Sequence, residues 1–178
     1  MPALAFVGGV SASGKTTLLG QVPGRDRTWA GWSASKLIAD ELGLEKLPTD
    51  DAADVLGYQE ALVRSYQRRS RAASLPIVLD GHFALPTRTG WMAVPVSIFH
   101  ALAPRVLDLV SADAQEIQRR RARRDGEAPA AADISLGIIA ELRAARATAE
   151  ALGVALHEWP VSPATATALA ALIEELTP

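Results

Sequence analysis

Short apolar runs alternate along the chain with longer segments that have helical spacing. Four of the runs are apolar at nearly every position, which is typical of strands that are buried on both faces. A fifth run, which contains two tryptophans, is a weaker candidate for a strand. The predicted strands are Ala3–Gly8, Arg27–Ser33, Ile77–Asp80, Arg105–Val110 and Val154–Trp159.

Two of the helical segments begin with capping signals. Ser111 or Asp113 precedes one helix, with Glu116 near the third position of the first turn. Ser162 precedes another helix, in which Pro163 occupies the first position. The predicted helices are Lys15–Gly20, Ser35–Leu42, Asp51–Ala73, Asp113–Arg124, Ile134–Leu152 and Pro163–Leu176.

The alternation of strands and helices predicts the class of fold. Strands separated by helices form βαβ units, and parallel strands of this kind need helices on both faces of their sheet. We therefore expect an α/β fold with a five-stranded parallel sheet flanked by helices. The chain has 178 residues, a length typical of one domain, and we expect residues 1–178 to form a single domain.

Composition and charge exclude several classes of function. The formal net charge of −2 provides no basic field for nucleic acid or an anionic membrane, so we expect neither as a partner. Because the chain has no cysteine, it has no disulfides, thiolate metal sites or cysteine nucleophiles. No apolar run approaches the roughly 20 residues that span a bilayer, and the N-terminus lacks the basic start of a signal peptide. We expect a soluble, cytoplasmic monomer or small homo-oligomer.

One motif carries specific chemistry. The sequence GVSASGKT, from Gly9 to Thr16, matches the pattern G-x-x-x-x-G-K-S/T between a predicted strand and a predicted helix. Glycines allow positive φ angles and close approach, so that backbone N–H groups can converge on phosphate oxygens. Lys15 can reach the β- and γ-phosphates of ATP, and the Thr16 hydroxyl can bind Mg²⁺. The predicted phosphate contacts are Gly9, Ser11, Ala12, Ser13, Gly14, Lys15, Thr16 and Thr17.

Beyond this loop, the chain resembles archaeal-type adenylate kinases and related nucleotide kinases of the P-loop class. The resemblance covers most of the chain. It is carried by the order of the elements, by PIVLDGH at a strand end, by the loop LPTRTGWMAVP and by the helical segment EIQRRRARRD. It implies a three-layer P-loop NTPase fold with a short lid, and an ATP-dependent kinase that uses Mg²⁺. The acceptor-binding region would be about 33–74, and the lid about 119–135.

The resemblance also assigns roles to residues at the end of the predicted strand Ile77–Asp80. Ligands of open α/β sheets bind at the carboxyl ends of the strands. We therefore expect Asp80 to hold a water molecule of Mg²⁺ or to accept a hydrogen bond from the phosphoryl acceptor. His82 would face the acceptor. The alternative is that Asp80 starts a turn and that His82 is a surface residue.

Five arginines of EIQRRRARRD lie around the circumference of one predicted helix, so at least half of them must be exposed. In the resembling kinases, arginines at this place reach a lid, and arginines near a transferring phosphoryl group stabilise its charge. We expect Arg120 and Arg124, one turn apart, to reach phosphate; Arg119 and Arg123 are the alternative pair. The stretch Arg123–Ser135 contains glycine and proline and predicts a mobile loop that closes over the site.

The acceptor side departs from the adenylate kinase pattern. Those kinases bind the acceptor phosphate with arginines between their second and third strands, where this chain has an acidic segment at 50–54 and no arginine before Arg64. Carboxylates repel a phosphate, whereas they accept hydrogen bonds from hydroxyl groups. The predicted acceptor contacts are Ser33, Lys36, Asp51 and His82.

The best single prediction of function is a kinase that transfers the γ-phosphoryl group of ATP to a nucleoside monophosphate. A nucleoside, a sugar or another hydroxyl compound is the alternative acceptor. A switch or NTPase that hydrolyses nucleotide without a cosubstrate is an alternative from a different class, as is a subunit of a partner-bound ATPase. The Asn/Thr-Lys-x-Asp pattern of GTPases is absent. The predicted catalytic residues are Lys15, Asp80, Arg120 and Arg124.

Overall fold

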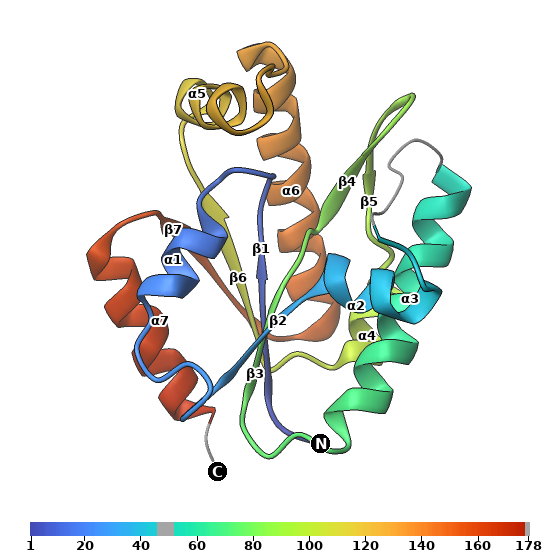
Figure 1. The fold of residues 1–178 in the computed structure, drawn as a ribbon, viewed down its shortest axis with the longest axis vertical. Helices are drawn as coiled ribbons and strands as arrows, with labels where there is room; N and C mark the ends of the chain where they lie inside the picture. The colour runs from blue at the N-terminus through green and yellow to red at the C-terminus, as the bar shows by residue number, and fades with distance from the viewer. Residues whose placement is uncertain (46–51, 177–178) are drawn as a thin grey trace.

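A five-stranded parallel sheet lies at the centre of the molecule, in the order β2-β3-β1-β6-β7 (Figure 1). The computed structural model describes residues 1–45 and 52–176. The predicted α/β fold with five parallel strands is confirmed. The strands are β1 Leu4–Gly8, β2 Ala30–Ser33, β3 Ile77–Asp80, β6 Val106–Ser111 and β7 Ala155–Pro160.

The weak strand at the edge of the sheet is shorter than predicted. It begins at Ala30 because the residues before it form a turn, in which the backbone N–H of Thr28 donates to the carbonyl of Gly24. Trp29 is buried beside this turn, and its indole N–H donates to the carbonyl of Pro23 at 2.9 Å. The two tryptophans of the run therefore serve different elements, and only the second lies in β2.

Helices cover both faces of the sheet (Figure 1). Because successive residues of a strand point to opposite faces, β1 contributes Ala5 and Val7 to one core and Leu4 and Phe6 to the other. Helices α1 and α7 cover the first face, and α2, α3, α4 and α6 cover the second. The helices are α1 Lys15–Gln21, α2 Ala34–Leu42, α3 Ala52–Ser70, α4 Val96–Leu102, α5 Ala114–Asp125, α6 Ala131–Leu152 and α7 Pro163–Glu175.

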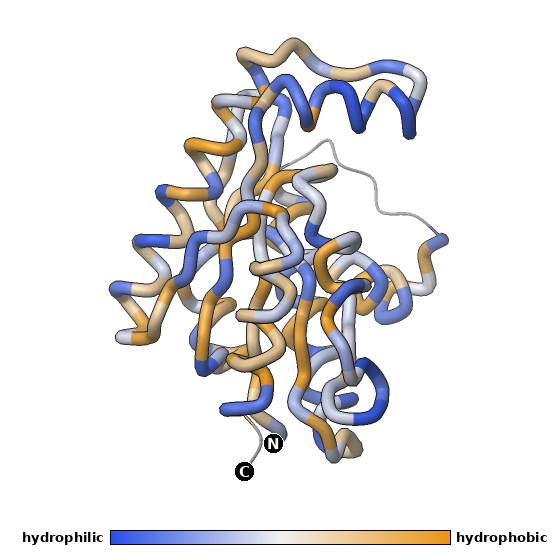
Figure 2. The backbone as a smooth tube through the Cα atoms, turned by 90° about the vertical axis from the view of Figure 1, so that its left-hand side faces the viewer, coloured by the Kyte–Doolittle hydropathy of each residue, from blue (hydrophilic) through white to orange (hydrophobic). Residues whose placement is uncertain are grey.

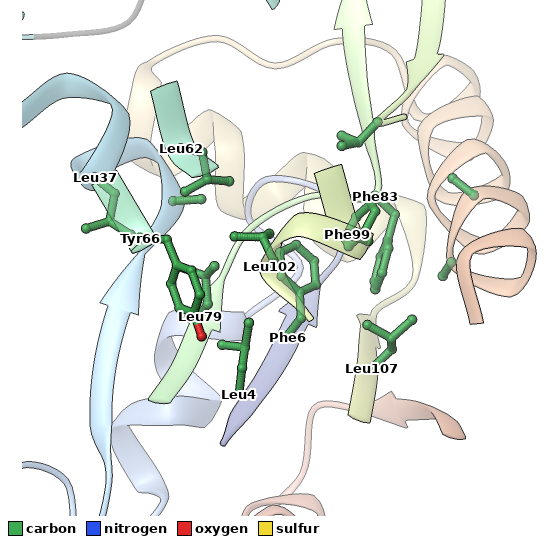
Figure 3. Packing of buried hydrophobic residues seen from close by; sticks show 14 of the residues in the cluster. Leu4, Phe6, Leu37, Leu62, Tyr66, Leu79, Phe83, Phe99, Leu102 and Leu107 are labelled. Atoms are coloured by element: carbon green, nitrogen blue, oxygen red, sulfur yellow. The ribbon is translucent and has the colours of Figure 1, made fainter. Parts of the chain in front are cut away.

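The larger core has an aromatic centre, shown in Figure 3. The ring centroid of Phe6 lies 5.0 Å from those of both Phe83 and Phe99, in edge-to-face packing. Phe83 and Phe99 stack on one another with their centroids 5.5 Å apart. These rings, together with Leu102, link the central strand to the segment that follows β3 and to α4.

The segment LPTRTGWMAVP is not the loop that the sequence predicted. Residues Ala84–Thr87 (β4) and Gly90–Ala93 (β5) form an antiparallel hairpin, and α4 follows it. The Thr87 hydroxyl closes the turn by donating to a backbone carbonyl at 3.1 Å. The two strands are short, and Pro86 lacks the N–H that a strand in a larger sheet would use, so the sequence carries only a weak strand signal here.

The hairpin rests on α6. Trp91 of β5 packs against the helix at Gly137, where an added Cβ would lie only 2.4 Å from the indole ring. At the base of the hairpin, the backbone N–H of Val94 donates to the carbonyl of Phe83 at 2.8 Å. The hairpin is therefore held at a defined position above the end of the sheet.

The predicted mobile loop Arg123–Ser135 is mostly helical. Helix α5 continues to Asp125 and α6 begins at Ala131, so that only the residues between them, 126–130, connect the two helices. Gly126 ends α5 in the left-handed conformation (φ 83°). The sequence placed the loop correctly and overestimated its length.

Both predicted helix starts have a side-chain cap. For α5, where the sequence left Ser111 and Asp113 as alternatives, the structure identifies the capping residue. The Asp113 carboxylate accepts hydrogen bonds from the backbone N–H groups of Gln115 (2.9 Å) and Glu116 (3.3 Å), so Asp113 is the N-cap of α5. The Ser162 hydroxyl accepts from the N–H of Thr165 at 3.1 Å and caps α7.

Hydropathy separates the elements clearly (Figure 2). The inner strands β1, β3 and β6 consist mostly of hydrophobic residues, whereas α5 is hydrophilic along most of its length, as its run of arginines requires. Among the helices described, none is both long and apolar enough to cross a membrane.

Candidate active site

The phosphate loop joins β1 to α1 at the carboxyl end of the central strand. Gly9 (φ 141°) and Gly14 (φ 105°) have backbone angles that residues with side chains rarely adopt. A Cβ at Gly9 would also lie 2.2 Å from the carbonyl oxygen of Val110 on β6. The two glycines therefore let the loop curl tightly over the end of the sheet, as a backbone cradle for phosphate requires.

Lys15 lies at the centre of this loop and is almost fully buried. Its Nζ donates to the carbonyls of Gly9 (2.5 Å) and Val10 (3.3 Å). It also lies 3.8 Å from Oδ1 of Asp80. Burial lowers the pKa of Lys15, and the negative charge of Asp80 opposes that shift. Loop carbonyls and a carboxylate thus hold the ammonium group at the place where the motif predicts phosphate.

Asp80 lies at the end of β3, opposite Val7 of β1 and Ser33 of β2. Burial raises the pKa of Asp80, while Lys15, His82 and a hydrogen bond from the Thr16 side chain lower it. Asp80 and Thr16 therefore lie beside Lys15, and their predicted roles in binding Mg²⁺ stay predictions.

The Thr16 hydroxyl and the Asp80 carboxylate fit the predicted binding of Mg²⁺. A hydroxyl and a carboxylate are the kind of ligands that Mg²⁺ uses together with water and phosphate oxygens. In residues 1–45 and 52–176, no cluster of three or more histidine, aspartate or glutamate side chains offers a self-contained metal site. Thr16 and Asp80 are accordingly the residues that would hold Mg²⁺, with the nucleotide supplying further ligands.

His82 is oriented by a residue that the sequence analysis missed. Its Nδ1 lies 2.7 Å from Oε1 of Glu141, which is buried on α6. The other carboxylate oxygen accepts from the backbone N–H groups of Phe83 (2.7 Å) and Ala84 (3.2 Å). Since a carboxylate only accepts hydrogen bonds, Nδ1 of His82 carries the hydrogen of this contact.

A signal for Glu141 does exist in the sequence. The residues of α6 that face the sheet recur at helical spacing, and Glu141 belongs to the same stripe as Ile134, Ala144 and Ala145. A charged residue on the apolar face of an amphipathic helix needs a buried partner. The charge on this stripe therefore indicates a functional or structural contact, although it does not identify His82 as the partner.

The arginine pair that the sequence favoured faces the phosphate loop. Nη1 of Arg120 donates to the carbonyls of Ser13 (2.9 Å) and Ala12 (3.4 Å). Nη2 of Arg124 lies 3.3 Å from Oγ of Ser11, and its guanidinium also pairs with Asp125. Both arginines line the hollow beside the loop. Their contact with phosphate stays a prediction.

The alternative pair lies elsewhere. Arg119 is exposed and pairs with Glu116 at 2.6 Å, and Arg123 is exposed on the same outer side of α5. Arg121, which the sequence analysis did not select, also contacts the loop, since its Nε donates to the carbonyl of Ser11 at 3.2 Å. Burial lowers the pKa of Arg121. Three arginines of α5, not two, therefore contact the phosphate loop.

A cavity of about 100 Å³ lies on the acceptor side, between α2, α3, α4 and the hairpin. Its lining overlaps that of the pocket around Lys15, Thr16 and Asp80, because Ala34, Ser35 and His82 line both. His82 therefore lies where the two pockets meet, and its predicted contact with the acceptor stays a prediction.

The other predicted acceptor contacts are placed differently. Ser33 and Lys36 line another hollow, together with Arg25 and Arg69, and this hollow also reaches Thr16 and Asp80. Ser33 lines the pocket around Lys15 as well. The Ser33 hydroxyl lies 3.0 Å from that of Ser35, which does line the acceptor cavity. Asp51 lies outside the described residues. Lys36 does not line the acceptor cavity, and its role stays a prediction.

The fold is similar to that of several solved structures. A gluconokinase from Sinorhizobium meliloti 1021 matches with a TM-score of 0.55 and 13% identity, over 99% of this chain and 94% of that one. A shikimate kinase from Acinetobacter baumannii, in complex with shikimate, matches with a TM-score of 0.57 and 14% identity, over 99% and 92%. A sugar kinase from Janibacter sp. HTCC2649 matches with a TM-score of 0.51 and 20% identity, over 100% and 97%. At these identities the likeness shows the fold alone.

Comparison by sequence supplies the family. No curated protein matches the chain. A family model described as an AAA domain matches residues 8–135, from the last residue of β1 to the first turns of α6. This match contains the phosphate loop, Asp80, His82 and the arginines of α5, and it spans well over half of the sequence. The resemblance to archaeal-type adenylate kinases stays a prediction, and the chain belongs to the AAA domain family.

Proposed function

We propose that this protein is an ATP-dependent kinase that transfers the γ-phosphoryl group to a hydroxyl group of a small molecule. The observation that carries the proposal is the overlap between two pockets. The pocket around Lys15, Thr16 and Asp80 shares Ala34 and Ser35 with a cavity large enough for a small molecule. Hydrolysis by water needs no such cavity, whereas transfer to a cosubstrate does.

The roles of the residues follow from their positions. Lys15 and the backbone N–H groups of the loop would bind the β- and γ-phosphates, and Arg120 and Arg124 would stabilise charge on the transferring group. Thr16 and Asp80 would hold Mg²⁺, which supplies charge neutralisation between the phosphates when it is bound.

The acceptor is better described as a hydroxyl compound than as a nucleoside monophosphate. A second phosphate near the γ-phosphate needs cations of its own to offset repulsion. Among the described residues that line the acceptor cavity, none is a lysine or an arginine. The structural neighbours include a gluconokinase, a sugar kinase and a shikimate kinase, which supports an acceptor of the hydroxyl type.

The test is the consumption of ATP by the purified protein with and without candidate acceptors, under saturating Mg²⁺. A kinase should show slow background hydrolysis that rises severalfold with a correct acceptor, together with a phosphorylated product seen by mass spectrometry. A rate of hydrolysis that is high without acceptor, and is unchanged by every compound, would favour the NTPase or switch and reject the kinase.

A further inference from the structure

The acceptor cavity is built from the hydrophobic core of the molecule. Phe6, Phe99 and Leu102, each at most 2% exposed, form part of its wall, and Leu62 adds to it from α3. Figure 3 shows these side chains converging from β1, α4 and α3. Tight packing is the rule in protein cores, so a cavity of about 100 Å³ bounded by such residues suits an apolar occupant.

Polar groups are few in this wall. Among the described residues that line the cavity, none is a lysine, arginine, aspartate or glutamate. The polar side chains there are Ser35, Tyr58, Gln59 and His82. A polyol or a sugar acid carries several hydroxyl groups, and burying them against Phe6, Phe99 and Leu102 would leave them without hydrogen-bond partners.

The polar groups that adjoin the phosphate loop lie at one end. Ser35 and His82 line both the cavity and the pocket around Lys15 and Asp80. Glu141 holds Nδ1 of His82 at 2.7 Å, which fixes the imidazole at this end of the cavity. One hydroxyl group placed at this end would meet both the imidazole and the γ-phosphate.

We infer that the acceptor is a neutral alcohol with a mainly apolar body of about one or two aromatic rings, whose hydroxyl group lies at His82. This inference rests on the proposed kinase function. In the reaction, the alcohol oxygen bonds to the γ-phosphorus of ATP while the bond from that phosphorus to the bridging oxygen breaks. ADP leaves with the electron pair of that bond. The hydroxyl proton is released to solvent, so the products are a phosphate monoester and ADP.

The test compares three sets of compounds: aromatic alcohols (phenethyl, cinnamyl and naphthylmethyl alcohol), polyhydroxylated acids (gluconate and shikimate) and nucleoside monophosphates (AMP and CMP). Transfer is measured from γ-labelled ATP, and binding is measured by calorimetry in the presence of a non-hydrolysable ATP analogue. We expect the aromatic alcohols to bind and to be phosphorylated about tenfold faster, or more, than either other set.

The two readouts separate the two ideas. Phosphorylation of gluconate, shikimate or AMP without phosphorylation of any aromatic alcohol would overturn the inference and leave the kinase intact. Binding of the alcohols without transfer to any compound would overturn the kinase and leave the preference of the cavity intact. If the alcohols neither bind nor are phosphorylated, the inference is overturned.

A matched pair of variants places the effect in the cavity. Ile98 on α4 lines the cavity and is partly exposed, whereas Ile139 on α6 is 45% exposed and does not line it. Ile98→Arg should abolish binding of aromatic alcohols, because it introduces a charge among apolar groups. Ile139→Arg should leave it unchanged. Calorimetric binding of the ATP analogue reports whether each variant is folded, and equal binding of alcohols by a folded Ile98→Arg variant would reject the cavity as the acceptor site.

Discussion

The phosphate side and the acceptor side of the candidate site differ in how they are built. On the phosphate side, one loop of consecutive residues supplies the backbone cradle, Lys15 and Thr16, and charged groups surround it. On the acceptor side, side chains from β1, α2, α3, the hairpin and α4 form an apolar wall with few polar groups. The two sides meet at His82 and Ser35.

This difference teaches which part of a site can be recognised from local sequence. Phosphate is bound by backbone groups and by charge, so its site depends on a fixed local spacing. An apolar acceptor is bound by shape, which arises only when distant segments pack together. Substitutions on the two sides should therefore affect different kinetic constants, and the following changes test that separation from the largest effect to the smallest.

Lys15→Ala should have the largest effect, because it removes the cation closest to the phosphates. We expect transfer to fall by about 10³-fold and the affinity for ATP to weaken. Binding of an acceptor alcohol, measured by calorimetry without nucleotide, should stay the same. Full activity of the variant would reject the assignment of the loop.

Asp80→Asn should lower turnover by about 10²-fold, with much less effect on the affinity for ATP. The amide keeps the size of the side chain and loses the negative charge that would hold Mg²⁺ with Thr16. A steady-state titration of Mg²⁺ checks this change, since the variant should need more metal for half-maximal rate. A variant with normal turnover and normal metal dependence would show that Asp80 has no role in transfer.

Arg120→Ala should lower turnover by about tenfold, because the guanidinium that contacts the loop carbonyls at Ser13 and Ala12 is lost. Arg119→Ala is the matched control on the same helix, since Arg119 pairs with Glu116 at the exposed surface and makes no hydrogen bond or ion pair with the phosphate loop among the residues that the structure describes. Single-turnover rates of the two variants should differ. Equal rates would mean that α5 contributes nothing specific through the face that contacts the loop.

The smallest kinetic effect is expected at Asp108, which is buried in β6 on the face covered by α1 and α7. The Trp159 indole donates to Oδ1 of Asp108 at 2.6 Å, and Nδ1 of His157 lies 3.3 Å from the same oxygen. Burial raises the pKa of Asp108, and these two neighbours lower it in part. Because the pKa is raised, the folded protein keeps this proton to higher pH than the unfolded chain does. The contribution of Asp108 to stability is therefore fully present below its unfolded pKa of about 3.9 and is lost as pH rises through the folded pKa.

Asp108→Asn should consequently raise the thermal midpoint at neutral pH by about 2–4 °C, and this gain should shrink toward pH 4. The amide oxygen can still accept from Trp159. Thermal unfolding followed from pH 4 to pH 8 checks the trend, and the constants for ATP and acceptor should not change. A gain that is the same at every pH would contradict the raised pKa.

The sequence predicted the parts of the molecule that depend on local pattern. The five strands, the phosphate loop and the strand end at Asp80 follow from apolar runs and glycine spacing. Arg120 and Arg124, which contact the loop, were selected on the resemblance to nucleotide kinases and not on local pattern alone. The hairpin was missed because its strands are short and contain Pro86. The acceptor cavity was missed for a different reason, since residues such as Phe6 and Phe99 look like ordinary core residues until the fold brings them around a space.

Glu141 lies near the middle of helix α6. At a rise of 1.5 Å per residue, its 22 residues span about 33 Å, and Glu141 lies about 15–17 Å from either end. A tilt of α6 by about 4° around its C-terminal end would move Glu141 by about 1 Å and the first turn of the helix by about twice that distance. A displacement of about 1 Å is enough to stretch the 2.7 Å contacts of Glu141 with His82 and with the backbone N–H of Phe83. Residues 126–130 connect α5 to the N-terminal end of α6. A movement of α5 that tilted α6 about its C-terminal end would therefore displace Glu141, beside His82, by about half the displacement of the first turn of α6.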